Sequence, residues 1–164
     1  MTDAPLSHQL ENEKLIVDAY VTLYEFIMQV EGETAYLRLK ENNSVDWQGK
    51  HWQGLPLSFE GSSVSQTDSP RRPKFVCANP NGVFSPYVLG GYLVGATMYR
   101  YRVLYDDLIE NRNVYQMQKW KVWQPKTFTS SHVELELRTP MDGFNVKLPR
   151  RTYTAPEFPI LQIK

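Results

Sequence analysis

The chain has a single cysteine, Cys77, among its 164 residues, so no disulfide can form within it. A lone cysteine in the apolar run 74–78 is typical of a small buried hydrophobic residue. Long apolar runs are also missing, because no stretch approaches the roughly 20 residues that a membrane-spanning helix needs. The N-terminus lacks the order of basic, apolar and small residues that marks a signal peptide. We therefore expect a protein that is made in the cytoplasm and has no direct contact with a membrane.

An excess of charge of either sign is absent as well. The 18 basic and 18 acidic residues cancel, which argues against a surface that neutralises many nucleic-acid phosphates, so no specific nucleic-acid binding is expected. Near-zero net charge removes self-repulsion and suits a subunit that packs closely against copies of itself.

The residue patterns of catalytic and cofactor sites are not found. The three histidines, His8, His51 and His132, have neither helical nor metal-finger spacing. The acidic pair Asp106 and Asp107 lacks the alternating oxygen ligands of a calcium loop. The glycines of segment 90–95 do not have dinucleotide-binding spacing, and a helix-to-strand junction explains them better. The Gly-x-Ser-x-Gly motif that carries the nucleophilic serine of a hydrolase triad does not occur. The sequence thus predicts no catalytic residues, no metal and no cofactor, and a protein that is not an enzyme.

What the chain does have is alternation with a period of two, the signature of strands. It is strongest in 15–28 and 96–105. Further strands are predicted at 34–39, 57–64, 74–78, 114–123, 132–138 and 144–148. A short helix is expected within 83–93 and a charged loop or helical turn over 106–113. The fold class is therefore mainly β, an antiparallel barrel or sandwich with one or two short helices, with α+β as the alternative.

Three regions divide the chain. Residues 1–14 are polar and predict an N-terminal arm or short helix. Residues 15–148 form the β-rich domain. Residues 149–164 hold Pro149, Pro156 and Pro159 and predict an extended C-terminal tail.

Two copies of a Trp-Gln-Gly unit, beginning at Trp47 and Trp52, are the most distinctive local pattern. Gln48-Gly49 fits the tip of a two-residue hairpin, because glycine accepts the positive φ that such turns require. We expect a display hairpin whose two indoles keep part of their surface free to contact a partner protein. Trp47 and Trp52 are the predicted interface residues. Stacking of sugars on Trp47, Trp52, Trp120 and Trp123 is the competing hypothesis.

Several short segments in a fixed order resemble the N-terminal portion of the minor tail protein L family of lambda-like phages. The resemblance runs through about two-thirds of the chain, and its segments are non-catalytic. The matching segments are 45–49, Arg72 with Pro73, 74–79, Gly82, 93–97 leading to Arg100 and Val103, 119–122, 137–140 and 148–150.

The resemblance implies a structural subunit of the virion at the tip of a long, non-contractile tail, made in the host cytoplasm. Its implied partners are copies of itself in a ring (a trimer is one option), the distal tail protein and the central hub and fibre protein. Family members continue into a cysteine-rich region that resembles an iron–sulfur segment. This sequence ends at Lys164 with Cys77 alone, and a cluster needs several thiolates, so no cofactor is expected.

Two other functions remain open from the sequence. One is a different ring-forming virion protein, such as a head–tail connector or tail terminator. The other is a soluble β-barrel module that binds a carbohydrate or a small ligand on its aromatic residues.

Overall fold

A computed structural model describes residues 5–6, 19–61 and 72–139. The predicted tail, the strand expected at 144–148 and all of the predicted arm except Pro5 and Leu6 lie outside these residues. The strands are β1 (Tyr20–Val30), β2 (Glu33–Glu41), β3 (Val45–Trp47), β4 (Lys50–Leu55), β5 (Leu57–Glu60), β6 (Lys74–Ala78), β7 (Thr97–Leu104), β8 (Gln116–Phe128) and β9 (His132–Arg138). The helical segments between them are η1 (Pro80–Gly82), α2 (Ser85–Leu89) and α3 (Tyr105–Ile109).

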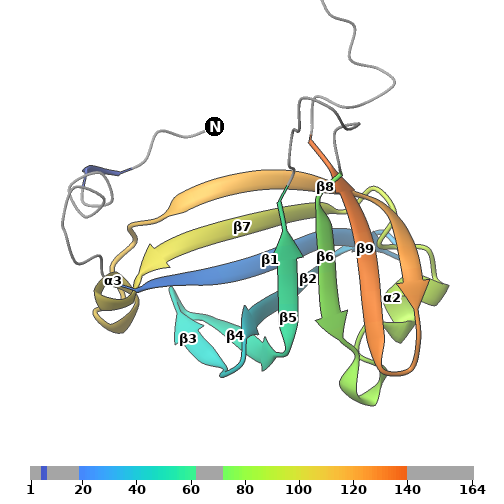
Figure 1. Cartoon of the computed structure of the whole chain (residues 1–164), viewed down its shortest axis with the longest axis horizontal. Helices are drawn as coiled ribbons and strands as arrows, with labels where there is room; N and C mark the ends of the chain where they lie inside the picture. The colour runs from blue at the N-terminus through green and yellow to red at the C-terminus, as the bar shows by residue number, and fades with distance from the viewer. Residues whose placement is uncertain (1–4, 7–18, 62–71, 140–164) are drawn as a thin grey trace, which may run out of the picture.

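The nine strands of the described residues belong to one sheet in the order β3-β4-β2-β1-β7-β8-β9-β6-β5. Neighbouring strands are antiparallel except β2 and β4, which run parallel. The sheet folds over on itself, so that β5, β6 and β9 cross the long strands β1, β2 and β7 at a steep angle (Figure 1). Pro56 alone separates β4 from β5, which lie near opposite ends of the strand order. The mainly β prediction with few short helices is therefore confirmed.

Strand β8 belongs to both layers, because it pairs with β7 along its first half and with β9 along its second. Two register irregularities, between Val122 and Gln124 and between Pro125 and Thr127, lie where it turns from one layer to the other. The register skips Trp123 and Lys126, and Pro125 between them lies opposite Leu135. A bulge bends a strand and interrupts its hydrogen-bond ladder, so a proline is tolerated beside it. The strands predicted at 114–123 and 132–138 place Pro125 in the connection between them. That expectation is wrong, since the strand continues through it.

The main core lies between the two layers. Phe75 of β6 packs edge-on against Tyr24 and Phe26 of β1, with both pairs of ring centroids 5.1 Å apart. Phe84, which precedes α2, is fully buried at one end of this core. Cys77 is buried here as predicted, and burial raises the pKa of its thiol to about 12. The thiol is therefore in its protonated, unreactive form at neutral pH.

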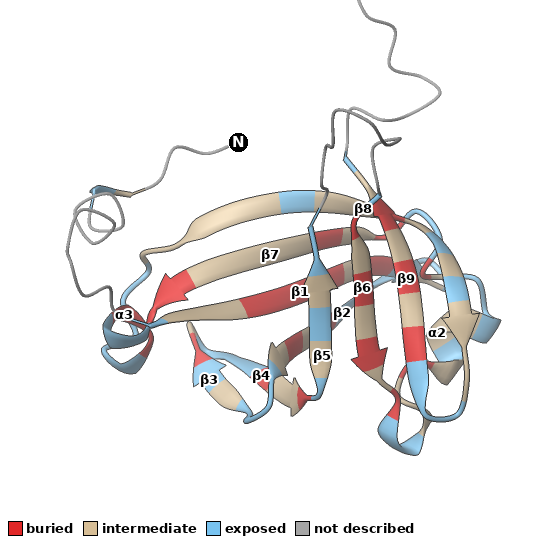
Figure 2. Ribbon diagram, viewed as in Figure 1, coloured by how far each residue is buried: buried red, intermediate tan, exposed pale blue. Residues whose placement is uncertain are grey.

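A second, smaller core lies on the other face of the long strands. It contains Leu23 of β1, Val103 of β7 and Leu108 of α3, together with the two hairpin tryptophans. Leu23 and Tyr24 are neighbours in sequence, point to opposite faces and are both buried. Figure 2 shows this continuous burial in the middle of β1. Coverage of both faces explains why β1 carries apolar residues on each side.

Most predicted strands agree with the structure to within a few residues. Segment 74–78 is β6 without change, and 34–39 and 96–105 correspond to β2 and β7. The strand predicted at 57–64 ends at Glu60 within the described residues, and the one predicted at 15–28 is described from Tyr20 onward and reaches Val30. The predicted helix is α2, with Pro86 in its first turn and Gly90 at its end, and the charged segment 106–113 contains most of α3.

Candidate interface at the Trp-Gln-Gly hairpin

The turn at the hairpin tip has the geometry that its sequence predicts. Strands β3 and β4 pair with Trp47 opposite Lys50, leaving Gln48 and Gly49 as the two turn residues. Both have positive φ, 54° and 67°, as the mirror-image turns of tight hairpins require. The predicted hairpin is confirmed.

The two indoles lie on the same side of this hairpin and point into the protein. Trp47 is 4% exposed and Trp52 is 1% exposed. Their ring centroids are 6.3 Å apart, and both pack against Tyr101 of β7 at 6.4 and 5.8 Å. Tyr115, just before β8, closes the group with its ring 5.7 Å from Trp47. Together they form a cluster of four aromatic rings.

The expectation that part of each indole stays free for a partner is therefore wrong. The hairpin folds its apolar side over the face of the sheet that would otherwise expose Leu23 and Val103, and the indoles fill that space. Burial also removes Trp47 and Trp52 from a sugar-stacking platform. Trp120 packs against the main core, and the Trp123 ring lies beneath the guanidinium groups of Arg72 and Arg138 at 5.3 and 4.4 Å. A role of the hairpin as a whole in protein contact stays a prediction.

Hydrogen bonds fix the tip of the hairpin to the segment after α3. The backbone N–H of Gln48 donates to Oδ1 of Asn111 at 2.8 Å, and its side-chain amide donates to the Asn111 carbonyl at 2.7 Å. The indole N–H of Trp47 donates to the carbonyl of Arg112 at 3.2 Å. These bonds span more than sixty residues of sequence, so the tip is held in one position by tertiary structure.

A buried carboxylate lies at the edge of the aromatic cluster. Glu25 of β1 is 3% exposed, and its Oε1 accepts from the Arg38 guanidinium at 2.7 Å. The Lys50 ammonium lies 3.6 Å from the same oxygen, and the Tyr101 hydroxyl donates to Oε2 at 3.0 Å. Burial, followed by the negative charge of Glu25, raises the pKa of Tyr101. The carboxylate thus links four strands, β1, β2, β4 and β7.

Sequence reasoning missed this network. The signal was a charged residue between Tyr24 and Phe26 in the middle of an otherwise apolar strand. A buried charge is normally paired, so its position predicts partners on neighbouring strands. The identity of those partners depends on strand order, which the local sequence does not carry.

The outward side of the hairpin is polar. Asp46 and His51 face each other across the strand pair with Oδ1 and Nδ1 2.6 Å apart, and their side chains are 80% and 66% exposed. Because the indoles point inward, these two residues and the turn are what the hairpin offers to a partner.

The remaining sequence-predicted residues do not converge on a site. His8 lies outside the described residues, whereas His51 is on the hairpin and His132 bonds to Ser131 and Thr129 beside β9. Asp107 is buried in α3, 3.3 Å from the Arg112 guanidinium. In the described ranges no group of three histidine, cysteine or carboxylate side chains could hold a metal ion, and no helix there has the length and apolar content to cross a membrane.

Residues 28–159 match the family described as phage minor tail protein L. The chain belongs to this family. The matched span begins near the end of β1 and includes the hairpin and every later strand. Membership of the L family makes the chain a phage tail structural protein, associated with the virion. Comparison with curated proteins returns no match.

Proposed function

We propose that this L-family protein is a ring subunit of the tail tip of a long, non-contractile tail. In this position it joins the distal tail ring to the central hub and fibre protein. It is made in the host cytoplasm and has no catalytic activity. Its partners are further copies of itself, with a trimer as one option, and the two neighbouring tail components.

The family match over 28–159 is the observation that carries this proposal. The described fold is consistent with a structural role. Its two cores are filled by hydrophobic and aromatic side chains, and the charged groups near them are paired with one another instead of meeting around a reactive centre.

Electron microscopy of labelled tails tests the position. We expect an antibody or gold label on this protein to mark the tip, and a nonsense mutation in its gene to give particles without complete tails. Labelling at the head end of the tail would favour a head–tail connector or terminator instead. Complete, infectious particles without the protein would refute a structural role.

A further inference from the structure

Helix α3 lies at one end of the long strands (Figure 1). Its exposed side chains are apolar and acidic, and we call this surface the α3 projection. Tyr105 and Ile109 are 51% and 65% exposed, although both are large hydrophobic residues. Asp106 and Glu110 are exposed beside them. Leu108 is buried in the second core and holds the helix in place. Exposed apolar groups of this size, bordered by charge, are typical of a contact surface.

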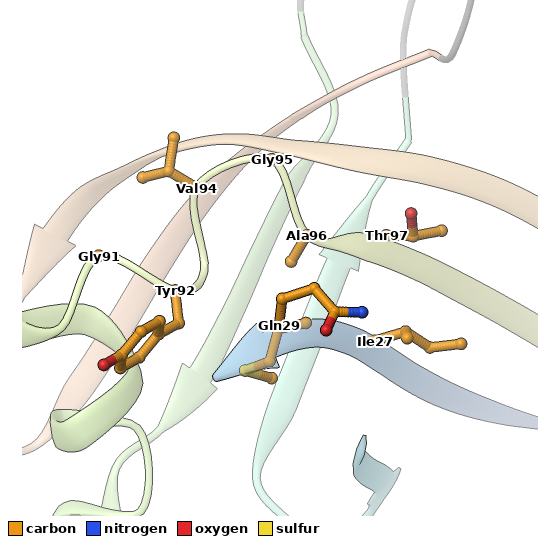
Figure 3. Close-up of a pocket in the computed structure, with 9 residues that line it drawn as sticks. Ile27, Gln29, Gly91, Tyr92, Val94, Gly95, Ala96 and Thr97 are labelled. Carbon is orange, nitrogen blue, oxygen red and sulfur yellow. The ribbon is translucent and has the colours of Figure 1, made fainter. Parts of the chain in front are cut away.

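The opposite end of the same strands carries a hollow. Strand β1 pairs with β7 only as far as Ile27 opposite Thr97. The chain before Thr97 turns away, because the N–H of Gly95 donates to the carbonyl of Val122 at 2.9 Å. A hollow of about 410 Å³ lies between the strand and the diverging loop (Figure 3). Its lining includes Ile27, Gln29, Tyr92, Val94, Ala96 and Thr97.

The surroundings of the hollow add apolar and basic groups. Val94, which lines the hollow, is 56% exposed, and Leu89, two residues before the lining residue Gly91 in sequence, is 78% exposed. Lys121 of β8 lies opposite Thr97 in the register, and Lys119 follows two residues away on the same face. The Lys119 ammonium lies 5.7 Å from the centroid of the Tyr99 ring. Among the described residues neither lysine has a carboxylate in ion-pair range, so neither charge is neutralised there.

The α3 projection matches these properties. It combines two exposed apolar side chains with two exposed acidic ones, Asp106 and Glu110. Arg112 contacts Glu110 and the buried Asp107, so Asp106 is the acidic group without a basic neighbour in the described part of α3. The hollow combines exposed apolar groups with lysines that have no carboxylate partner within the described ranges. The two surfaces therefore complement each other in both polarity and charge.

We propose that α3 of one copy seats in the hollow between β1 and the 91–96 loop of the next copy. The eight residues of β7 separate the two surfaces by about 25 Å, at roughly 3.3 Å per residue, so one subunit can use both at once. A head-to-tail contact closes into a ring when the rotation that relates one subunit to the next brings the last subunit back to the first. This contact rests on the proposed ring function and names the surfaces that would build the ring.

Disulfide trapping in purified tails tests the contact. Two variants, Ile109→Cys and Val94→Cys, are supplied together to a phage that lacks the gene, and the tails are oxidised and analysed without reducing agent. We expect cross-linked dimers in tails that contain both variants and none in tails with either variant alone. A chain that carries both substitutions should give a series of cross-linked bands at multiples of the subunit mass. Cys77 is buried and does not interfere.

Two controls make the result specific. Ser58→Cys, on the exposed side of β5, replaces Val94→Cys and should not cross-link to Ile109→Cys. Exchanging charges offers a second readout: Asp106→Lys and Lys121→Glu should each reduce the yield of tails, and combining them in one chain should restore it.

The outcomes separate this contact from the proposed function. Tails that contain the protein but show no cross-link between the two variants, or that show Ile109→Cys linked to itself, would refute the head-to-tail contact and leave the tail role intact. Absence of the protein from purified tails would refute the proposed function itself.

Discussion

From the sequence alone, Trp52 could be either an interface residue or a core residue. Its indole is 1% exposed and contacts Trp47 and Tyr101, so it belongs to a core. Trp52→Ala should cost about 3–5 kcal/mol of unfolding free energy, as large-to-small core substitutions do. Urea unfolding followed by circular dichroism measures this loss.

A matched control is available in Trp123→Ala. That ring is half-buried beneath Arg72 and Arg138, and cation–π contacts of this kind contribute about 0.5–2 kcal/mol. Its replacement should cost clearly less than that of Trp52. A stable, folded Trp52→Ala protein would contradict the core assignment.

The Tyr101 hydroxyl predicts a loss of stability at alkaline pH. Its pKa in the folded protein is raised above the ordinary tyrosine value of 10.0, by burial and by the negative charge of Glu25. The unfolded chain therefore releases this proton at lower pH than the folded one, so the stabilisation is complete below pH 10 and declines as pH rises beyond it. Urea midpoints at successive pH values above 10.0 should fall.

In Tyr101→Phe this group cannot ionise, so the alkaline decline should be shallower even though the variant is less stable at neutral pH. Equal slopes in the two proteins would show that Tyr101 does not contribute to the decline.

At the scale of elements, glycine has different functions at two positions of the hairpin. Gly49 supplies positive φ at the tip, and a Cβ there would meet nothing within 4 Å. A Cβ on Gly54 would lie 2.1 Å from the carbonyl oxygen of Asn42, a backbone atom that cannot move alone. Gly54→Ala should therefore destabilise more than Gly49→Ala, whose cost is about 1–2 kcal/mol for the left-handed conformation. Thermal unfolding of the two variants compares them, and the reverse order would refute this account.

The polar side of the hairpin permits a test of partner contact without disturbing the core. Asp46 and His51 are largely exposed, and exposed ion pairs contribute about 0–1 kcal/mol. Replacing both by alanine should leave the unfolding midpoint nearly unchanged but reduce the yield of complete tails, if the hairpin contacts a neighbour. Normal tails from a stable double variant would remove the hairpin from the interface.

The strands could be predicted from the sequence because their signals are local. Segment 74–78 is a short apolar run that opens after Pro73 and ends before a turn, and these features alone define β6. Strand β8 illustrates the limit. A proline normally ends a strand or lies at its edge. At Pro125 the strand continues, because its pairing with β9 is bulged on both sides of the proline.

The tip of the candidate interface was predictable for the same reason, and its environment was not. Gln48 and Gly49 define the turn by themselves. Burial of Trp47 depends on Tyr101, Tyr115 and the Arg112 carbonyl, which are more than fifty residues away in sequence. The direction of the indoles is therefore a tertiary property that the repeated Trp-Gln-Gly unit does not carry.

For the whole molecule, β8 and β1 imply a single cooperative unit. Strand β8 pairs in both layers, and β1 contributes to both cores with adjacent residues, Leu23 and Tyr24. Neither core can lose its packing without disturbing a strand of the other. We expect equilibrium unfolding with coincident transitions by tryptophan fluorescence and far-UV circular dichroism. Two separated transitions would show that the cores unfold independently.

The pairing of β1 with β7 also has a consequence during synthesis. Strand β1 is complete once Val30 has emerged, and β2 follows at once along one edge, but the partner of its other edge begins only at Thr97. At 5–20 residues per second, translation leaves that edge open for roughly 3–13 s. An unpaired strand edge can associate with the same edge of another nascent chain. Weaker induction, which lowers the number of nascent chains present at once without slowing elongation, should therefore raise the soluble yield, and so should folding helpers that cover the open edge.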